Sequence, residues 1–298
     1  MSTKITTKKQ VEQLLNDYDT FLFDCDGVLW QGSHLLPKVN ETISMLHERG
    51  KQLIFVTNNS TKSRRTYQQK FEKFGLQVSA DEIFCSAYSA AVYLDKVVKF
   101  PKDKKVFVVG EAGIEEELAS VGIKTIGGTD PNFKTEPSEE AMASVERNPE
   151  VGCVLAGLDT HINYYKIAYA QQQLNDPSTL FLATNIDTTF PTKGKLLPGA
   201  GTIIQSIAAC SGREPAAALG KPSDQMMDTI KAKFHFDPSR AIMVGDRLNT
   251  DMVFGDKGGL GTLFVLTGVD TEQAIAKDPI VTPKYFANKL GDLYELLN

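Results

Sequence analysis

The fold of this chain is decided by one stretch, Phe21-Leu-Phe-Asp24-Cys-Asp26-Gly27-Val-Leu-Trp30. Its first three residues form a continuous apolar run, which is typical of a strand buried on both faces of a parallel sheet. The functional crevice of such a sheet lies beyond the carboxyl ends of its strands. We therefore expect Asp24 at that end of the strand and Asp26 in the turn just past it. Gly27 supplies the backbone freedom that lets the chain leave the strand sharply.

Apolar runs of strand length alternate with helix-like segments along the rest of the chain. The runs that predict further strands are Leu53–Thr57, Ile83–Ser86, Val106–Gly110, Cys153–Ala156, Leu180–Thr184, Ala241–Gly245 and Leu263–Leu266. Two stretches rich in glycine and proline interrupt the pattern, so we expect mainly loop over Gly127–Pro149 and a linker over Pro191–Gly201. A closing helix is expected over Lys289–Leu297. The alternation predicts an α/β protein with a doubly wound, Rossmann-like parallel sheet.

Composition and charge exclude several classes of protein. The chain has 298 residues, enough for two domains of ordinary size, and a net charge of −5. Because no long run of lysine and arginine is present, we expect no nucleic-acid or membrane partner. No apolar stretch approaches the roughly 18 residues of a membrane span, and the first residues lack the apolar core of a signal peptide. The four cysteines are far apart, as is typical of thiols in a reducing compartment. We expect a cytoplasmic protein, with the nucleus left open.

Several predicted strands end in residue types that carry chemistry. If these strands are neighbours, the side chains at their ends open onto one crevice. Three ionised carboxylates there, those of Asp24, Asp246 and Asp251, would repel one another unless cations lie among them. Lys221 supplies one positive charge, and Mg²⁺, which prefers hard oxygen ligands, would supply two more. The strand-end residues are, in chain order, Asp24, Asp26, Thr57, Asn58, Lys221, Asp246 and Asp251.

A site of this kind suits phosphoryl transfer. Asp24 is placed to attack phosphorus and form an aspartyl-phosphate. A metal held by Asp24, Asp246 and a nearby backbone carbonyl would shield this nucleophile from the negative charge of the substrate. Asp26, if neutral, can protonate the leaving alkoxide and then activate water for the second half-reaction. The groups left to bind phosphate oxygens are Thr57, the Asn58 backbone and Lys221.

Four short motifs, taken in order, resemble those of the haloacid dehalogenase superfamily. They are Asp24-x-Asp26-Gly-Val, the strand-terminal Thr57, Gly220-Lys221-Pro222 and Gly245-Asp246-Arg247-x-x-Thr250-Asp251. The longer strings around them are similar to the branch with 4-nitrophenylphosphatases, phosphoglycolate phosphatases and pyridoxal phosphatases. The resemblance covers essentially the whole chain. It implies a Mg²⁺-dependent phosphomonoester hydrolase for small phosphorylated metabolites such as 2-phosphoglycolate, active on 4-nitrophenyl phosphate in vitro. Asp26 favours a phosphatase, because dehalogenases of this superfamily lack the second acid.

A second domain is expected inside the first. Roughly 160 residues separate Thr57 from Lys221, far more than one crossover of a sheet requires. The resemblance implies an α/β cap at this place, which we predict over residues 97–194, with a discontinuous catalytic core over 1–96 and 195–298. The cap would select the substrate, and relatives of this type often pair through it, so a homodimer is a further expectation. The cap segment Ala183-Thr-Asn185-Ile-Asp187 resembles the family's Thr-Asn-x-Asp, which favours phosphoglycolate-like substrates.

The sequence thus nominates a complete set of site residues, with alternatives open. The candidate catalytic residues are Asp24, Asp26 and Lys221. The candidate substrate-binding residues are Gly27, Thr57, Asn58, Asn59, Asn185 and Asp187, and the candidate metal ligands are Asp24, Asp26, Asp246 and Asp251. Whether Asp251 binds the metal directly or orients other ligands stays open. Alternative functions are a pyridoxal phosphate phosphatase, a phosphotransferase of the same fold, and a non-catalytic sensor of phosphorylated metabolites.

Overall fold

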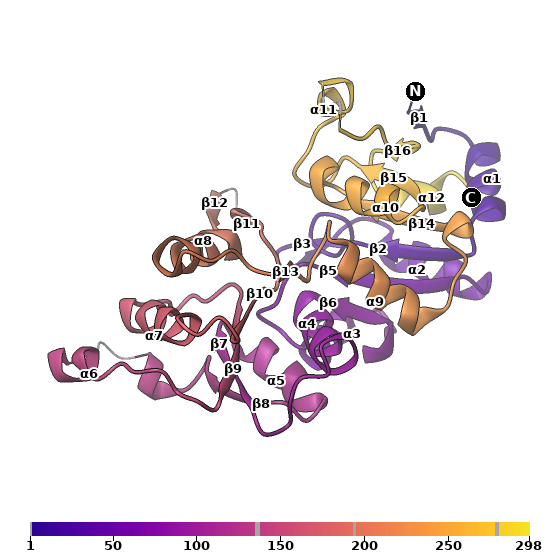
Figure 1. Ribbon diagram of the computed structural model, residues 1–298. Helices are drawn as coiled ribbons and strands as arrows, with labels where there is room; N and C mark the ends of the chain where they lie inside the picture. Colours follow the sequence, from indigo (N-terminus) through magenta and orange to yellow (C-terminus); the bar gives the residue numbers. More distant parts are fainter. Residues whose placement is uncertain (1, 135–137, 193–194, 278–279) are drawn as a thin grey trace. The chain divides into compact units, whose positions relative to one another are not determined.

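The computed structural model describes residues 2–134, 138–192, 195–277 and 280–298 (Figure 1). The chain divides into two compact units. Unit 1 comprises Met1–Thr57, Gln68–Phe84 and Lys221–Asn298, and unit 2 comprises Asn58–Tyr67 and Cys85–Gly220. Unit 1 is therefore built from both ends of the chain. Within the described ranges, every helix is too short or too polar to cross a bilayer.

Unit 1 contains a seven-stranded sheet and most of the helices that flank it in sequence. Its strands are β1 (Thr3–Lys4), β2 (Thr20–Phe23), β5 (Gln52–Thr57), β6 (Ile83–Cys85), β14 (Ala241–Gly245), β15 (Gly261–Val265) and β16 (Tyr285–Ala287), with a small pair β3 (Trp30–Gln31) and β4 (His34–Leu35). Its α-helices are α1 (Lys8–Asp17), α2 (Val39–Glu48), α9 (Asp224–Phe234), α10 (Val253–Lys257), α11 (Glu272–Lys277) and α12 (Asp292–Glu295), and α3 (Arg64–Lys73) begins in unit 2 and ends in unit 1. Single turns of other helix types are η1 (Ala80–Glu82), η4 (Pro238–Arg240) and η5 (Leu248–Met252).

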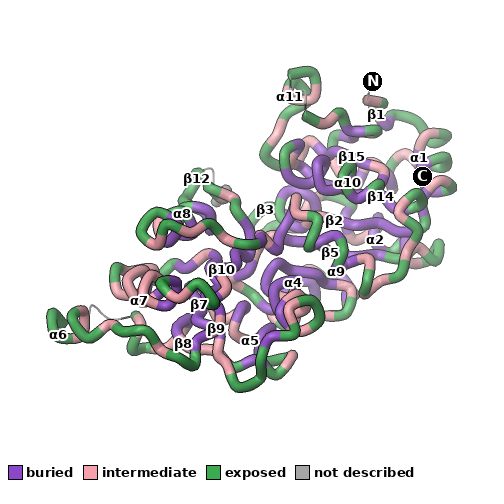
Figure 2. Tube along the Cα trace, in the orientation of Figure 1, coloured by how far each residue is buried: buried purple, intermediate pink, exposed green. Residues whose placement is uncertain are grey.

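The strand β2 lies inside the large sheet, between β14 and β5. The order of the strands is β1-β16-β15-β14-β2-β5-β6. Parallel pairing sets Phe23 opposite Val244 on one side and opposite Phe55 on the other. Both β2 and β14 are buried along their whole length, as Figure 2 shows in purple. Because neighbouring parallel strands end at the same edge, the residues that follow β2, β5 and β14 emerge side by side.

Unit 2 is organised around a second parallel sheet. Its strands are β7 (Lys105–Val109), β8 (Lys124–Gly127), β9 (Val151–Ala156), β10 (Leu180–Ala183) and β13 (Ala217–Ala218), in the order β13-β10-β9-β7-β8, and β11 (Thr189–Thr192) pairs with β12 (Lys195–Pro198) in a separate hairpin. Its helices are α4 (Ser86–Val92), α5 (Ala112–Ser120), α6 (Glu139–Ala143), α7 (Tyr164–Leu174) and α8 (Ala200–Ser211), with the turns η2 (Tyr93–Val97) and η3 (Pro131–Phe133). The printed pairs of this sheet are all parallel.

An apolar cluster packs the helices α7 and α8 against the sheet of unit 2. Phe107 on β7, Phe181 on β10 and Leu174 on α7 are buried in the same cluster. The helix α8 adds Ile204 and Ile207 to it. Contacts therefore place α8 and the rest of residues 195–220 in unit 2, although the sequence assigned them to the catalytic core. The cap predicted over residues 97–194 lies wholly within unit 2, and its exact boundaries stay a prediction.

The expected fold class is confirmed, and two local predictions, the linker and the closing helix, are corrected. The stretch Pro191–Gly201 contains part of an antiparallel hairpin, β11 with β12, and the start of α8, because cross-strand pairing outweighs the local proline and glycine signals. The described part of Gly127–Pro149 is mainly loop, as predicted, and also holds the short elements η3 and α6. Ser138 caps α6 by accepting from the Ala141 N–H. The closing helix is limited to Asp292–Glu295. Residues 135–137 and 193–194, inside the first two stretches, lie outside the described residues.

Candidate active site

Three carboxylates gather at the carboxyl edge of the unit 1 sheet. Asp24 follows β2, Asp246 follows β14, and Asp251 lies in the turn η5 beyond it. One oxygen from each of these acids lies within 4.8 Å of the others. Asp246 and Asp251 are both buried, each with 2% of its surface exposed. The structure thus brings together the three acids that the sequence predicted for one crevice.

Lys221 lies among these acids. Its Nζ is 2.5 Å from Asp24 Oδ1 and 2.8 Å from Asp251 Oδ1, and it also donates to the Val56 carbonyl at 3.0 Å. The side chain is buried. The sequence analysis took Lys221 to follow a strand that neighbours those of Asp24 and Asp246, and that expectation was wrong. The strand that precedes it, β13, pairs with β10 in the other sheet. Lys221 therefore reaches the carboxyl edge of the large sheet from a loop, and a two-residue strand carried too little signal to reveal this.

Both oxygens of Asp251 are already engaged within unit 1. Oδ1 meets the Lys221 ammonium, and Oδ2 accepts from the main-chain N–H groups of Asp246 and Arg247, at 3.1 and 3.2 Å. This carboxylate therefore holds the loop after β14 and the lysine in place. The arrangement favours a role for Asp251 in orienting the other groups over direct contact with a metal.

The electrostatics of the cluster call for a further cation. Burial, and then the neighbouring Asp251 charge, raise the pKa of Asp246 to about 7. Burial also raises the pKa of Asp24 well above its usual range, against the opposing effect of Lys221. Burial alone would lower the pKa of Lys221, but the charges of Asp24 and Asp251 outweigh it and raise that pKa. Three acids thus share one ammonium, and carboxylate oxygens are the ligands that a hard divalent cation prefers.

The Asp26 carboxylate has partners of its own, outside the three-acid cluster. Its Oδ1 accepts from the Trp30 indole N–H at 2.8 Å and lies 3.7 Å from Lys70 Nζ. The side chain is 48% exposed. The side chain of Asp26 is not a member of the carboxylate cluster formed by Asp24, Asp246 and Asp251.

Two glycines, Gly27 and Gly268, lie against the Asp246 carboxylate. The sequence analysis named Gly27 but not Gly268. Gly27 has φ +93°, and a Cβ there would lie 2.6 Å from Asp246 Oδ2. A Cβ on Gly268 would collide with the same oxygen. The next residue, Val269, donates its N–H to Asp246 Oδ2 at 2.8 Å. This loop follows β15, a strand that the sequence predicted, and it also carries Asp270, whose carboxylate accepts from the Leu248 N–H at 2.8 Å. The sequence analysis did not single out this loop.

The predicted substrate residues divide between the two units. Thr57 ends β5 in unit 1 and is buried. Asn58, Asn185 and Asp187 belong to unit 2, where the Asp187 carboxylate accepts from both amide groups at 2.9 Å. Asn59 uses its amide oxygen on Thr61, accepting from the backbone N–H and the hydroxyl. Their roles in binding a substrate stay predictions.

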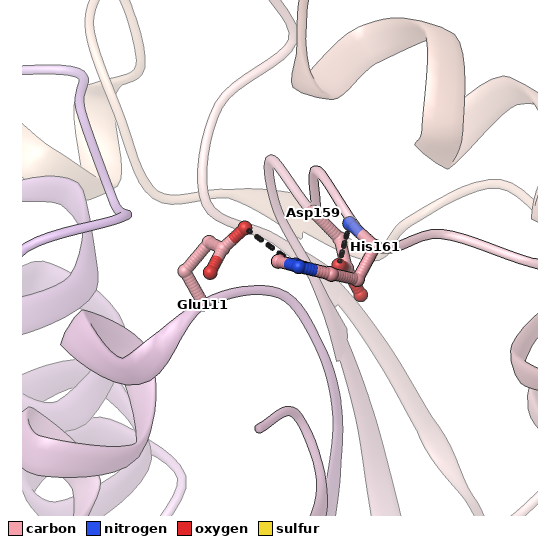
Figure 3. Close-up of side chains that lie close together, drawn as sticks. All are labelled: Glu111, Asp159 and His161. Atoms are coloured by element: carbon pink, nitrogen blue, oxygen red, sulfur yellow. Dashed lines mark hydrogen bonds and ion pairs between the residues drawn. The ribbon is translucent and has the colours of Figure 1, made fainter. Parts of the chain in front are cut away.

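Unit 2 holds a second group of potential metal ligands, Glu111, Asp159 and His161 (Figure 3). Asp159 accepts from the His161 N–H through Oδ1 and from the buried Lys166 ammonium through Oδ2, at 2.8 and 2.5 Å. Glu111 accepts from the N–H and hydroxyl of Thr160, and its Oε1 is 3.7 Å from His161 Nδ1. Because Lys166 already neutralises the buried acid, this group fixes the turn after β9 without needing a metal.

Comparisons with known proteins agree with this geometry. A family model described as haloacid dehalogenase-like hydrolase matches residues 21–124, and a second, described as HAD-hydrolase-like, matches residues 218–293. The chain is 49% identical over 297 residues to the 4-nitrophenylphosphatase of Schizosaccharomyces pombe, covering 99% of each chain. It is 43% identical to phosphoglycolate phosphatase 1A, chloroplastic, of Arabidopsis thaliana, covering 95% of this chain and 78% of that one. The structure is similar to glycerol phosphate phosphatase from Mycobacterium tuberculosis in complex with magnesium, with a TM-score of 0.77, 27% identity, and coverage of 94% and 77%.

Proposed function

Because this chain belongs to the haloacid dehalogenase-like hydrolases, and its named relatives are phosphatases, we propose that it hydrolyses small phosphorylated metabolites through an aspartyl-phosphate. It is a phosphatase of that family; the intermediate, the metal and the substrate are what we propose. The observation that carries the proposal is the position of the Lys221 ammonium between Asp24 and Asp251, beside Asp246. This arrangement combines a nucleophile with fixed positive charge, as phosphoryl transfer requires.

In the proposed reaction, a carboxylate oxygen of Asp24 attacks phosphorus while the bond from phosphorus to the leaving oxygen breaks. The proton of neutral Asp26 passes to that leaving oxygen, so an alcohol departs and Asp26 becomes a carboxylate. A water then gives its proton to Asp26 and attacks phosphorus, which releases inorganic phosphate and restores the Asp24 carboxylate. Lys221 and Thr57 stabilise the charge on the phosphate oxygens.

We propose Mg²⁺ as the cofactor, held by Asp24, Asp246 and the main-chain carbonyl of Asp26, with Asp251 orienting these groups. The donor set fits a hard divalent cation. Burial, and then the charge of Asp251, raise the pKa of Asp246, and such a cation would offset both effects. When bound, the ion neutralises the charge between nucleophile and substrate and polarises the phosphoryl group. A magnesium complex of a structural relative supports the choice.

For the substrate, we propose 2-phosphoglycolate or another short phosphorylated acid, with 4-nitrophenyl phosphate turned over in vitro. The names of the two curated relatives support this choice. In the proposal, unit 2 acts as the cap that selects the substrate, with Asn185 and Asp187 among its candidate contacts. A cytoplasmic location accords with the four cysteines, which all carry free thiols. Pairing of two copies through the cap stays a prediction.

The nucleophile is tested by Asp24→Asn. We expect turnover of 4-nitrophenyl phosphate to fall by more than about 10³-fold, because the amide cannot form the acyl phosphate. Free phosphate release is measured with Mg²⁺ present, and a thermal melt checks the fold. Asp256→Asn, an exposed acid on α10, is the matched control and should keep wild-type activity. Wild-type activity in Asp24→Asn would reject the proposed nucleophile.

The same assay separates the rival functions. A phosphotransferase would pass the phosphoryl group to an added sugar in preference to water. A sensor would bind phosphorylated metabolites without releasing phosphate. A pyridoxal phosphate phosphatase would show a higher kcat/KM for pyridoxal phosphate than for 2-phosphoglycolate.

A further inference from the structure

Asp26 is held by two residues outside the carboxylate cluster. The Trp30 indole N–H donates to Asp26 Oδ1 at 2.8 Å. The Lys70 ammonium lies 3.7 Å from the same oxygen and 4.0 Å from the centre of the Trp30 ring. The three side chains therefore form one group, with the lysine in contact with both the acid and the face of the aromatic ring.

The indole cannot easily turn away from this position. Trp30 is fully buried, and its ring packs edge-on against Phe71 and stacks with Phe74, with centroids 5.0 and 5.5 Å away. The main chain is fixed as well, because the Gly27 N–H donates to the Trp30 carbonyl at 2.8 Å. The hydrogen bond to Asp26 thus comes from a rigid, buried donor. An exposed acid without such a partner would sample several rotamers.

We propose that Trp30 and Lys70 are positioning residues for the acid–base chemistry of Asp26. The indole donates to Oδ1 and the ammonium forms an ion pair with the same oxygen, so Oδ2 is the oxygen left to carry the proton. In the acid step the O–H bond on Oδ2 breaks, the leaving oxygen takes the proton, and the electron pair stays on Asp26. In the base step Oδ2 takes a proton back from water. The inference rests on the proposed function, because it explains how Asp26, the acid proposed there, is held in position.

The test compares substrates whose leaving groups need the acid to different degrees. The 4-nitrophenolate ion is stable and departs with little help, whereas an alkoxide must be protonated as it leaves. For Trp30→Phe, which keeps an aromatic ring but removes the donor, we expect kcat/KM for 2-phosphoglycolate to fall about tenfold more than kcat/KM for 4-nitrophenyl phosphate. Glycerol 3-phosphate replaces 2-phosphoglycolate if it is the better substrate. Lys70→Gln should give a smaller loss of the same kind.

Two matched variants control for stability and charge. Tyr18→Phe also removes the polar group of a buried aromatic residue, one that accepts from Lys284, and Lys73→Gln removes an exposed lysine from the same helix as Lys70. Both should change kcat/KM for the two substrates equally. An equal loss for both substrates in Trp30→Phe would mean that the residue is only structural, and this would overturn the inference.

Asp26→Asn distinguishes failure of the inference from failure of the proposed function. If Asp26 is the acid, this variant loses far more activity on the alkyl phosphate than on 4-nitrophenyl phosphate, and adding Trp30→Phe to it widens that difference no further. If Asp26→Asn lowers kcat/KM equally for both substrates, Asp26 is not the acid. If Asp26→Asn lowers kcat/KM more for the alkyl phosphate than for 4-nitrophenyl phosphate, but Trp30→Phe lowers both equally, only the positioning role is wrong.

Discussion

At the scale of single residues, the position of the Asp246 carboxylate depends on two glycines that leave room for it. Gly27 and Gly268 both face its Oδ2, where a Cβ from either would be too close. The Val269 N–H then donates to that oxygen. The carboxylate is thus positioned by the close approach of two main-chain segments, which only glycine permits.

Gly268→Ala tests this dependence. The added methyl group must displace Asp246, so we expect the Mg²⁺ concentration for half-maximal activity to rise by about 10- to 100-fold. The KM for substrate at saturating Mg²⁺ should change less. Val269→Ala is the matched control, because its side chain is exposed and its N–H is kept. An unchanged Mg²⁺ requirement in Gly268→Ala would contradict the proposed role of Asp246.

The same residues show why the sequence revealed only part of the site. Asp24 and Asp246 carry charges whose place at strand ends is visible in the sequence, and the structure brings them together. Gly268 acts by lacking a side chain, so no chemical signal marks it. The rotamer of Asp26 depends on the packing of Trp30 against α3. This packing forms only in the folded chain, so the sequence does not show it.

At the scale of secondary structure, long buried strands were predictable and short pieces were not. The apolar runs that became β2, β5 and β14 end in polar residues, so both their type and their ends could be identified. The strand β13 has two residues, and its pairing with β10 depends on a distant partner. The hairpin of β11 with β12 contains Pro191 and Pro198, which argue locally against a strand.

Within unit 2, one buried ion pair ties α7 to two loops. Lys166 donates to Asp159 at 2.5 Å and to the Gly128 carbonyl at 3.1 Å, and its side chain is 0% exposed. In Lys166→Met, the carboxylate of Asp159 stays buried without its cation. We expect a loss of about 3–5 kcal/mol in the free energy of unfolding, measured by chemical denaturation.

The double variant Lys166→Met, Asp159→Leu should regain most of that stability, because both charges are gone. Lys105→Met is the control, since its partner Glu150 is exposed and the pair contributes less than about 1 kcal/mol. A loss no greater for Lys166→Met than for Lys105→Met would contradict the expected cost of leaving the Asp159 carboxylate buried without its partner.

At the scale of the whole molecule, the carboxylate cluster links stability to pH and to metal. The folded-state pKa of Asp246 is about 7, against an ordinary value of 3.8. Between these values the folded state binds more protons than the unfolded state, so the contribution of this group to stability falls as pH rises from about 4 to about 7. A divalent cation that binds the ionised carboxylates reverses the loss.

We therefore expect Mg²⁺ to raise the Tm clearly at pH 7.5 and only slightly at pH 5, in scanning calorimetry. Asp246→Asn should be more stable than the metal-free wild type at pH 7.5, because a buried charge is removed, and Mg²⁺ should stabilise it much less. NaCl at equal ionic strength controls for screening. If Mg²⁺ left the wild-type Tm unchanged at pH 7.5, the carboxylate cluster would not be a metal site.

The sheet of unit 1 has a consequence for synthesis on the ribosome. Its strand β2 is flanked by β5, made soon afterwards, and by β14, which begins only at Ala241. During most of translation one edge of β2 has no neighbour, and Asp24 has neither Lys221 nor Asp246 beside it. The nascent chain therefore carries an open, apolar strand edge until the last fifth of its residues emerges.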